Sequence, residues 1–284
     1  MSMNVFASVQ GMQQCALGQK KAGHRIGLIP TMGFLHEGHL SLVALARKRT
    51  DWVVLSIFVN PIQFMPGEDF LQYPRNFERD EALCEQAGVD LVFYPDQKEM
   101  YSTDHSVFVE ETSLSSGICG ASRPGHFKGV TTVVAKLFNI VMPDVAVFGQ
   151  KDAQQCRVIQ RMVRDLNINV EIVVGPIVRE PDGLAMSSRN RYLSPSGRKK
   201  ALCLRHSLDL AEKMVQAGER TVSVIQEAVW ATLSSEPEAN IDYVAFLDHE
   251  TLTPVLLIQR PVLLALAVRI GATRLIDNTV LYSP

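Results

Sequence analysis

About the first 175 residues alternate short apolar runs with segments of helical periodicity, and this alternation restricts the possible folds more than any other feature. The apolar runs are nearly uninterrupted and bounded by Gly, Pro or Asn, which is typical of strands covered on both faces. They predict strands at Arg25–Ile29, Trp52–Val59, Asp90–Tyr94, Val145–Phe148 and Val170–Val174. Helices are expected between them at roughly His39–Thr50, Asn76–Ala87, Gly129–Val141 and Asp152–Leu166. This order predicts an α/β fold with a parallel sheet, in which ligands bind at the carboxyl ends of the strands.

The pattern changes after Gly175. A polar loop at Val178–Leu193 is followed by Ser194-Pro195, which is a typical N-cap with proline at the first helical position. The remaining chain predicts helices at Pro195–Ala217 and Ser223–Ser234, then strands at Asp242–Leu247, Val262–Val268 and Thr273–Ile276. We therefore expect an α/β domain at residues 1–178 and a smaller C-terminal α+β domain at residues 179–284.

Composition excludes several classes of protein. Hydrophobic residues make up 46% of the 284-residue chain, which is enough for a packed core. A net charge of −2 argues against a long nucleic acid as partner. The five cysteines are odd in number and form no CxxC pair, so neither a disulfide framework nor a cysteine zinc site is expected. With no signal-peptide pattern and no long apolar run, the sequence predicts a cytoplasmic protein without a membrane partner.

The segment from Pro30 to His39, with the sequence PTMGFLHEGH, follows the first predicted strand and opens a helix. The free N–H groups at a helix start attract phosphate, and two imidazoles can donate to its oxygens. A metalloprotease HExxH site is excluded, because that motif needs histidine where Leu40 stands. The segment therefore indicates a phosphate site, and the alternative is a pair of ordinary surface histidines.

Two further strand ends carry polar side chains. Asn60 and Gln63, in NPIQF, offer amides that can hydrogen-bond a hydroxy acid, although Asn-Pro is also a common turn. After the strand ending at Phe148, Lys151 can place a positive charge on a phosphate and Asp152 can accept from ribose hydroxyls. Gln155 lies four residues after Lys151 and therefore on the same helical face. These segments indicate a site for an acid substrate beside a nucleotide.

Two loops have weaker signals. GASRPGHF, from Gly120 to Phe127, has the glycine spacing of a P-loop but lacks its Lys-Ser/Thr pair. It can close over a ligand or be a turn with solvated charges. MSSRN, from Met186 to Asn190, combines two hydroxyls with a guanidinium, a set suited to pyrophosphate. Taken alone, this segment is only a serine-rich loop.

Taken in order, these motifs resemble one family. HEGH and MSSRN resemble the HIGH and KMSKS signatures of the nucleotidyltransferase superfamily. Within it, PTMGFLHEGHLSLV, VVLSIFVNPIQF, SRPGHFKGV, VFGQKDAQQ, GLAMSSRNRYL and TRLIDN are similar to the pantothenate synthetases, which are pantoate–β-alanine ligases. The resemblance extends from Gly27 to Asn278. It implies a Rossmann-like nucleotide-binding domain, a C-terminal lid domain and a homodimer.

The resemblance also implies a reaction. The family joins pantoate to β-alanine through a pantoyl-adenylate, with ATP cleaved to AMP and pyrophosphate and with Mg²⁺ on the phosphates. The catalytic residues would be His36, His39, Lys151 and Arg189. The residues expected to contact ATP are Met32, Gly33, Phe34, Leu35, His36, Glu37, Gly38, His39, Gly149, Gln150, Lys151, Asp152, Val178, Met186, Ser187, Ser188 and Arg189.

By the same resemblance, Gln63 and Gln155 would hold pantoate, Gln63 would also contact β-alanine, and Asp80 would contact the metal ion. One rival is a transferase that joins AMP to a phosphate ester. It would need Arg or Lys where the neutral Gln63 and Gln155 stand. A tRNA-charging enzyme would need a basic C-terminal face, which the sequence lacks. A binding protein without activity would not need the intact histidines and cations.

Overall fold

The computed structural model describes residues 3–282, which form two compact units. The first unit comprises the chain up to Gln150 together with Gln155–Pro176, and the second comprises Lys151–Gln154 together with the chain from Ile177 onward. No pattern in the sequence indicated that Lys151–Gln154 belongs with the C-terminal part of the chain.

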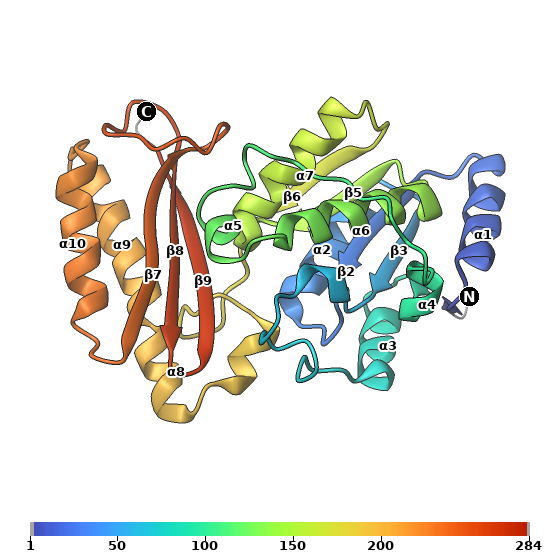
Figure 1. Cartoon of the computed structure of the whole chain (residues 1–284), viewed down its shortest axis with the longest axis horizontal. Coiled ribbons are helices and arrows are strands. Elements are labelled where there is room, and N and C mark those ends of the chain that lie inside the picture. Colours follow the sequence, from blue (N-terminus) through green and yellow to red (C-terminus); the bar gives the residue numbers. More distant parts are fainter. Residues whose placement is uncertain (1–2, 283–284) are drawn as a thin grey trace. The chain divides into compact units, whose positions relative to one another are not determined.

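The first unit contains a six-stranded parallel sheet in the order β1-β4-β3-β2-β5-β6 (Figure 1). The strands are β1 (Asn4–Phe6), β2 (Ile26–Thr31), β3 (Trp52–Ile57), β4 (Leu91–Phe93), β5 (Val145–Gly149) and β6 (Glu171–Gly175). All five strands predicted for this part of the chain are therefore confirmed. The sequence did not predict β1, because its three residues are largely exposed and form no apolar run.

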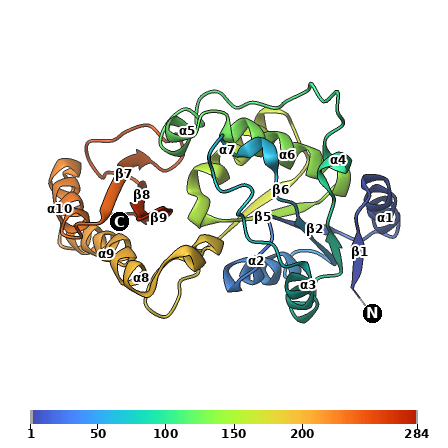
Figure 2. The same ribbon diagram turned by 60° about the horizontal axis from the view of Figure 1, so that its bottom comes forward.

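Helices cover both faces of this sheet (Figure 2). The longer ones are α1 (Val9–Lys21), α2 (Glu37–Arg47), α3 (Phe77–Gln86), α6 (His126–Val141) and α7 (Ala153–Asp165). The short ones are η1 (Pro61–Gln63), α4 (Gln97–Met100), α5 (Cys119–Ser122) and η2 (Gln150–Asp152). Parallel strands are joined by right-handed crossovers. The strand order therefore puts α2 and α3 on one face and α1, α6 and α7 on the other.

The second unit packs helices on an antiparallel sheet in the order β7-β8-β9. Its elements are η3 (Ser188–Tyr192), α8 (Pro195–Ala201), α9 (Cys203–Gln216), α10 (Val222–Ser234), β7 (Ala239–Asp248), β8 (Val262–Ile270) and β9 (Thr273–Leu281). Apolar side chains of α9, α10 and the sheet, among them Leu208, Val229 and Leu264, form one buried core.

The predicted fold class, a Rossmann-like parallel sheet with a smaller α+β unit, is confirmed. The predicted single helix Pro195–Ala217 is wrong, because it consists of two helices, α8 and α9. The N–H of Leu202 bonds to the carbonyl of Lys199, three residues back, and this tight turn ends α8. Within residues 3–282, no helix combines the length and the apolar character that crossing a membrane requires.

Candidate active site

The strand order brings three of the predicted motifs to neighbouring positions in the first unit. β3, β2 and β5 lie side by side in the middle of the sheet, and all three run in the same direction (Figure 1). Asn60–Gln63 follows β3, Met32–His39 follows β2, and β5 ends at Gly149. The carboxyl ends of adjacent parallel strands meet at one edge of a sheet. This edge is therefore the candidate site of the first unit.

The turn after β2 depends on an unusual backbone conformation. Gly33 and Phe34 both have positive φ angles, of 84° and 51°. A Cβ atom at Gly33 would lie 2.9 Å from Ile57 Cγ2, so a side chain there would be both strained and crowded. The hydroxyl of Thr31 donates to the carbonyl of Ser56 and accepts the N–H of Gly33 at 3.1 Å. The turn is thereby fixed to the end of β3.

Asp80 holds the same turn from the first turn of α3. Its Oδ2 accepts the N–H of Phe34 at 2.6 Å and its Oδ1 accepts the N–H of Leu35 at 2.8 Å. Arg79 Nη1 lies 3.3 Å from Oδ1. Burial raises the pKa of the Asp80 carboxyl, and the N–H bonds and the charge of Arg79 oppose that effect. Asp80 is only 1% exposed, so its carboxylate is engaged by the protein itself.

This geometry does not fit Asp80 as a metal ligand, because both of its oxygens point at backbone N–H groups. Among residues 3–282, no group of three or more His, Cys, Asp or Glu side chains is arranged to hold a metal ion by protein ligands alone. The interpretation of Asp80 as a metal contact remains a prediction that the arrangement of the turn does not support.

His36 and His39 meet at the start of α2, as the HEGH spacing predicts. The ring centroids are 4.0 Å apart, and His36 is the N-cap residue with an extended backbone. The backbone N–H of His36 donates to His39 Nδ1 over 3.4 Å. A neutral His39 that accepts at Nδ1 carries its proton on Nε2, which makes Nε2 the donor atom of this ring.

The side-chain amide of Gln63 is oriented by its neighbours at the end of β3. Its Oε1 accepts from Asn60 Nδ2 at 2.9 Å, and its Nε2 lies 3.2 Å from Met32 Sδ. Asn60 is in turn fixed by the Tyr101 hydroxyl, which donates to Asn60 Oδ1 at 2.9 Å. Gln63 and Met32, which come from different predicted motifs, are thus in direct contact. Thioether sulfur is a weak acceptor, so a stronger acceptor on a ligand can replace Met32 as the partner of Gln63 Nε2.

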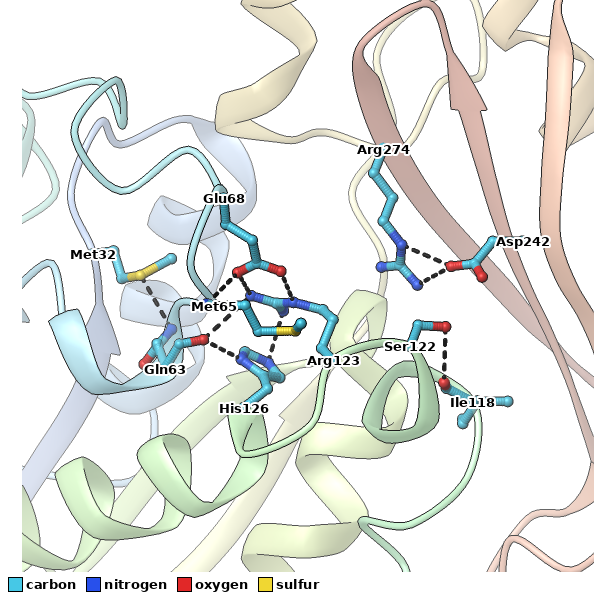
Figure 3. Close-up of polar contacts among 10 residues, drawn as sticks. All are labelled: Met32, Gln63, Met65, Glu68, Ile118, Ser122, Arg123, His126, Asp242 and Arg274. Carbon is cyan, nitrogen blue, oxygen red and sulfur yellow. Dashed lines mark hydrogen bonds and ion pairs between the residues drawn. The ribbon is translucent and has the colours of Figure 1, made fainter.

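The backbone carbonyl of Gln63 is held by a second set of residues, shown in Figure 3. His126 Nδ1 donates to this carbonyl at 2.8 Å, and Arg123 Nη2 donates to it at 3.3 Å. Arg123 Nη1 is 2.9 Å from His126 Nε2, so His126 is a neutral imidazole with its proton on Nδ1. The GASRPGHF loop therefore supports Gln63 within the first unit.

Glu68 completes this set through two bonds from one guanidinium. Arg123 Nε and Nη2 donate to Glu68 Oε1 and Oε2 at 2.6 and 2.7 Å (Figure 3). Partial burial disfavours the charged form of Glu68, but the hydrogen bonds and charge of Arg123 hold the pKa of its carboxyl below the usual value. Sequence reasoning missed Glu68 and Tyr101, since neither lies in a motif and each meets its partner only after folding.

Gln155 is half-buried in the first turn of α7, after β5. Among the described residues it takes no part in the hydrogen bonds that orient Gln63. The contact of Gln155 with pantoate therefore stays a prediction.

In the second unit, the MSSRN segment follows a short hairpin. Arg179 pairs with Ala185 across the hairpin, and the N–H of Met186 donates to the carbonyl of Val178 at 3.0 Å. Ser187 caps η3 by accepting the N–H of Arg189 at 3.3 Å. Lys151, in the same unit, is half-buried, and its carbonyl accepts from Asn278 Nδ2 at 3.0 Å.

Comparison with known proteins agrees with these observations. Residues 4–280 match the model of one family, pantoate–β-alanine ligase. The chain belongs to the pantoate–β-alanine ligase family. It is 56% identical over 279 residues to the pantothenate synthetase of Thermotoga neapolitana, a match that covers 98% of this chain and 100% of the relative. The predicted resemblance is confirmed, and the chain is an enzyme of the ligase class.

Solved structures of the family have the same fold. The pantothenate synthetase of Thermus thermophilus superposes with a TM-score of 0.94 at 45% identity, over 99% of this chain and 100% of that one. The pantoate–β-alanine ligase of Francisella tularensis, solved as a complex with β,γ-ATP and β-alanine, superposes with a TM-score of 0.81 at 32% identity. The latter match covers 98% of this chain and 97% of that one.

Proposed function

We propose that this ligase condenses pantoate with β-alanine in two steps, through a pantoyl-adenylate, and that ATP is cleaved to AMP and pyrophosphate. The observation that carries the proposal is the oriented amide of Gln63 in contact with Met32, the residue that precedes the Gly33–His39 turn and helix start. A neutral amide suits a hydroxy acid, and a helix start with two imidazoles suits phosphate. The nucleotide and β-alanine in the Francisella tularensis complex support the same substrates.

In the first step, an oxygen of the pantoate carboxylate attacks the α-phosphorus of ATP and pyrophosphate leaves. Negative charge accumulates on the phosphate oxygens, so fixed donors and cations provide the catalysis. We assign His39 Nε2–H, the His36 ring and the N–H groups at the start of α2 to these oxygens. The family resemblance assigns Lys151 and Arg189 to the same charges.

In the second step, the neutral amine of β-alanine attacks the acyl carbon of the adenylate and AMP leaves. The pantoyl group has to stay in place while pyrophosphate leaves the site and β-alanine enters it. Gln63 suits this task because its amide is held from the side chain by Asn60 and from the backbone by His126. A rigid donor loses little entropy when it binds the acyl oxygen.

Mg²⁺ would enter with ATP, held by phosphate oxygens and water, since it prefers few protein ligands. The ATP contacts expected from the sequence, the role of Gln155, the homodimer and the cytoplasmic location remain predictions. Sedimentation equilibrium of the purified chain tests the homodimer.

The decisive experiment is exchange of labelled pyrophosphate into ATP. With pantoate, ATP and Mg²⁺ but no amine, exchange is expected, and β-alanine should convert the intermediate to product. A dinucleotide-forming transferase would give no pantoate-dependent exchange. Exchange that required β-alanine would contradict the two-step reaction.

A further inference from the structure

Two neighbouring buried residues of β9, Asp277 and Asn278, have no part in the function proposed above. Each is only 3% exposed, and both belong to the TRLIDN segment that the family resemblance included. Successive side chains of a strand point to opposite faces, so two neighbours can hold two different segments. In this structure, Asn278 contacts Lys151, and Asp277 contacts the hairpin that leads to Ser187–Arg189.

Asp277 anchors the hairpin that leads to Ser187–Arg189. Its Oδ2 and Oδ1 accept from Arg179 Nη1 and Nη2 at 2.7 and 3.0 Å. Arg179 Nη1 also donates to the carbonyl of Gly183, at 3.1 Å, in the hairpin turn. One guanidinium therefore joins both the first strand and the turn of the hairpin to a buried carboxylate. A bidentate pair of this kind fixes orientation as well as distance.

Asn278 anchors Lys151. Its Nδ2 donates to the Lys151 carbonyl at 3.0 Å, although 127 positions separate the two residues. Its backbone N–H also donates to Asp277 Oδ1 at 2.8 Å, which links the two anchors to each other. An aspartate at position 278 would keep the shape of the side chain but could not donate to the carbonyl.

We propose that Asp277 and Asn278 are positioning residues that hold the two cationic segments, Lys151 and Ser187–Arg189, in register with β9 inside the second unit. This inference rests on the proposed function, in which Lys151 and Arg189 bind the ATP phosphates. Phosphoryl chemistry depends on the position of such cations, and a displacement of about 1 Å can cost up to about a hundredfold in rate.

The variants Asp277→Asn and Asn278→Asp test the inference, with Asp248→Asn as the matched control. Asp248 is also 3% exposed, lies in β7 of the same unit, and is hydrogen-bonded to Thr251 and paired with Arg260. We expect the first two variants to raise KM for ATP or lower kcat about tenfold, with KM for pantoate unchanged. The control should lower Tm and leave all kinetic constants unchanged. If Asp277→Asn and Asn278→Asp lowered Tm but changed neither KM for ATP nor kcat, the inference would be overturned.

Arg179→Lys keeps the charge and loses the bidentate geometry, so it remains informative if Asp277→Asn fails to fold. It should show a smaller rise in KM for ATP than Asp277→Asn. Normal ATP constants in Arg179→Lys, with a lowered Tm, would contradict the role of the pair.

A double-substitution cycle separates the inference from the proposed function. In a Lys151→Ala background, Asn278→Asp should have no further effect on ATP binding, measured by calorimetry, because it acts through Lys151. Additive effects would overturn the inference while leaving the role of Lys151 intact. Full activity of Lys151→Ala alone would instead contradict the assignment of Lys151 in the proposed function.

Discussion

The surroundings of Gln63 in the first unit and the hairpin before MSSRN in the second unit are stabilised in different ways. The buried Asn60 amide, a neutral group, orients the Gln63 side chain, and its backbone carbonyl is held by the His126 imidazole and by Arg123 of the Arg123–Glu68 pair. A buried pair, Arg179 with Asp277, holds the base of the hairpin. Its tip is held by ion pairs that reach solvent, those of Arg198 with Glu180 and with Asp182 at 2.7 Å. The side chains of these three residues are 25–34% exposed, whereas Asn60 is 1% exposed.

The two regions differ in how easily they can rearrange. Buried hydrogen bonds between neutral groups are insensitive to salt and costly to break, so the Gln63 amide keeps one orientation. Ion pairs that reach solvent are weak and screened, so a segment held by them can rearrange at low cost. A segment that binds ATP and releases pyrophosphate has to open and close. Rigidity is thus concentrated around the Gln63 amide and at the Arg179–Asp277 anchor, and adjustability at the hairpin tip, residues 180–183.

The largest expected effect belongs to Lys151→Ala. Loss of one charge-stabilising donor costs about 3–4 kcal/mol in the transition state, a decrease in kcat of about 10²–10³. Tm should change little, since the side chain is only half-buried. Steady-state kinetics and thermal unfolding measure the two quantities. Near-normal turnover would remove Lys151 from the mechanism.

Gln63→Ala should have a smaller effect, confined to the acid substrate. An unpaired ligand oxygen costs about 1–3 kcal/mol, which would appear mainly in KM for pantoate. Gln155→Ala should behave in the same way if the predicted pantoate contact is correct. A variant that weakened only ATP binding would contradict the assignment, and Gln160→Ala, on the same helix as Gln155, serves as the control.

Glu68→Gln should destabilise the first unit by about 1 kcal/mol near neutral pH, because the Arg123 pair loses its charge. The pKa of Glu68 is lowered in the folded state from its usual 4.5. The stabilisation is therefore complete above pH 4.5 and is lost as pH falls through the lower folded pKa. Denaturant unfolding at several pH values should show the difference between wild type and variant shrinking in acid. A constant difference would show that charge is not the cause.

The smallest expected effect is that of salt on proteolysis. Raising the salt concentration should increase cleavage at the hairpin tip, residues 180–183, because it screens the partly exposed ion pairs of Arg198. Cleavage of the loop carrying Gln63 should increase less, because its Arg123–Glu68 pair is more buried. ATP should protect the hairpin. Equal cleavage at low and high salt would contradict the comparison between the two regions.

The sequence alone determined the elements that depend on local pattern. Uninterrupted apolar runs specified strands β2 to β6, which are all the strands of the first sheet except β1. The HEGH spacing specified that His36 and His39 lie together at the start of α2. These features depend on residues a few positions apart, where periodicity and helix geometry act directly. The resemblance to the family was available from the same local motifs.

Which distant side chains come into contact depends on the tertiary structure alone. Glu68 and Arg123 are 55 positions apart, Asp80 and Phe34 are 46 apart, and Lys151 and Asn278 are 127 apart. No periodicity specifies such pairs, because each depends on strand order and on how two separately formed elements pack. The local sequence around a single acidic residue is the same whether its side chain stays in solvent or becomes buried against a partner. Burial, which the local sequence does not encode, makes Asp80 an anchor of the turn after β2 in the first unit and Asp277 an anchor of the hairpin in the second unit.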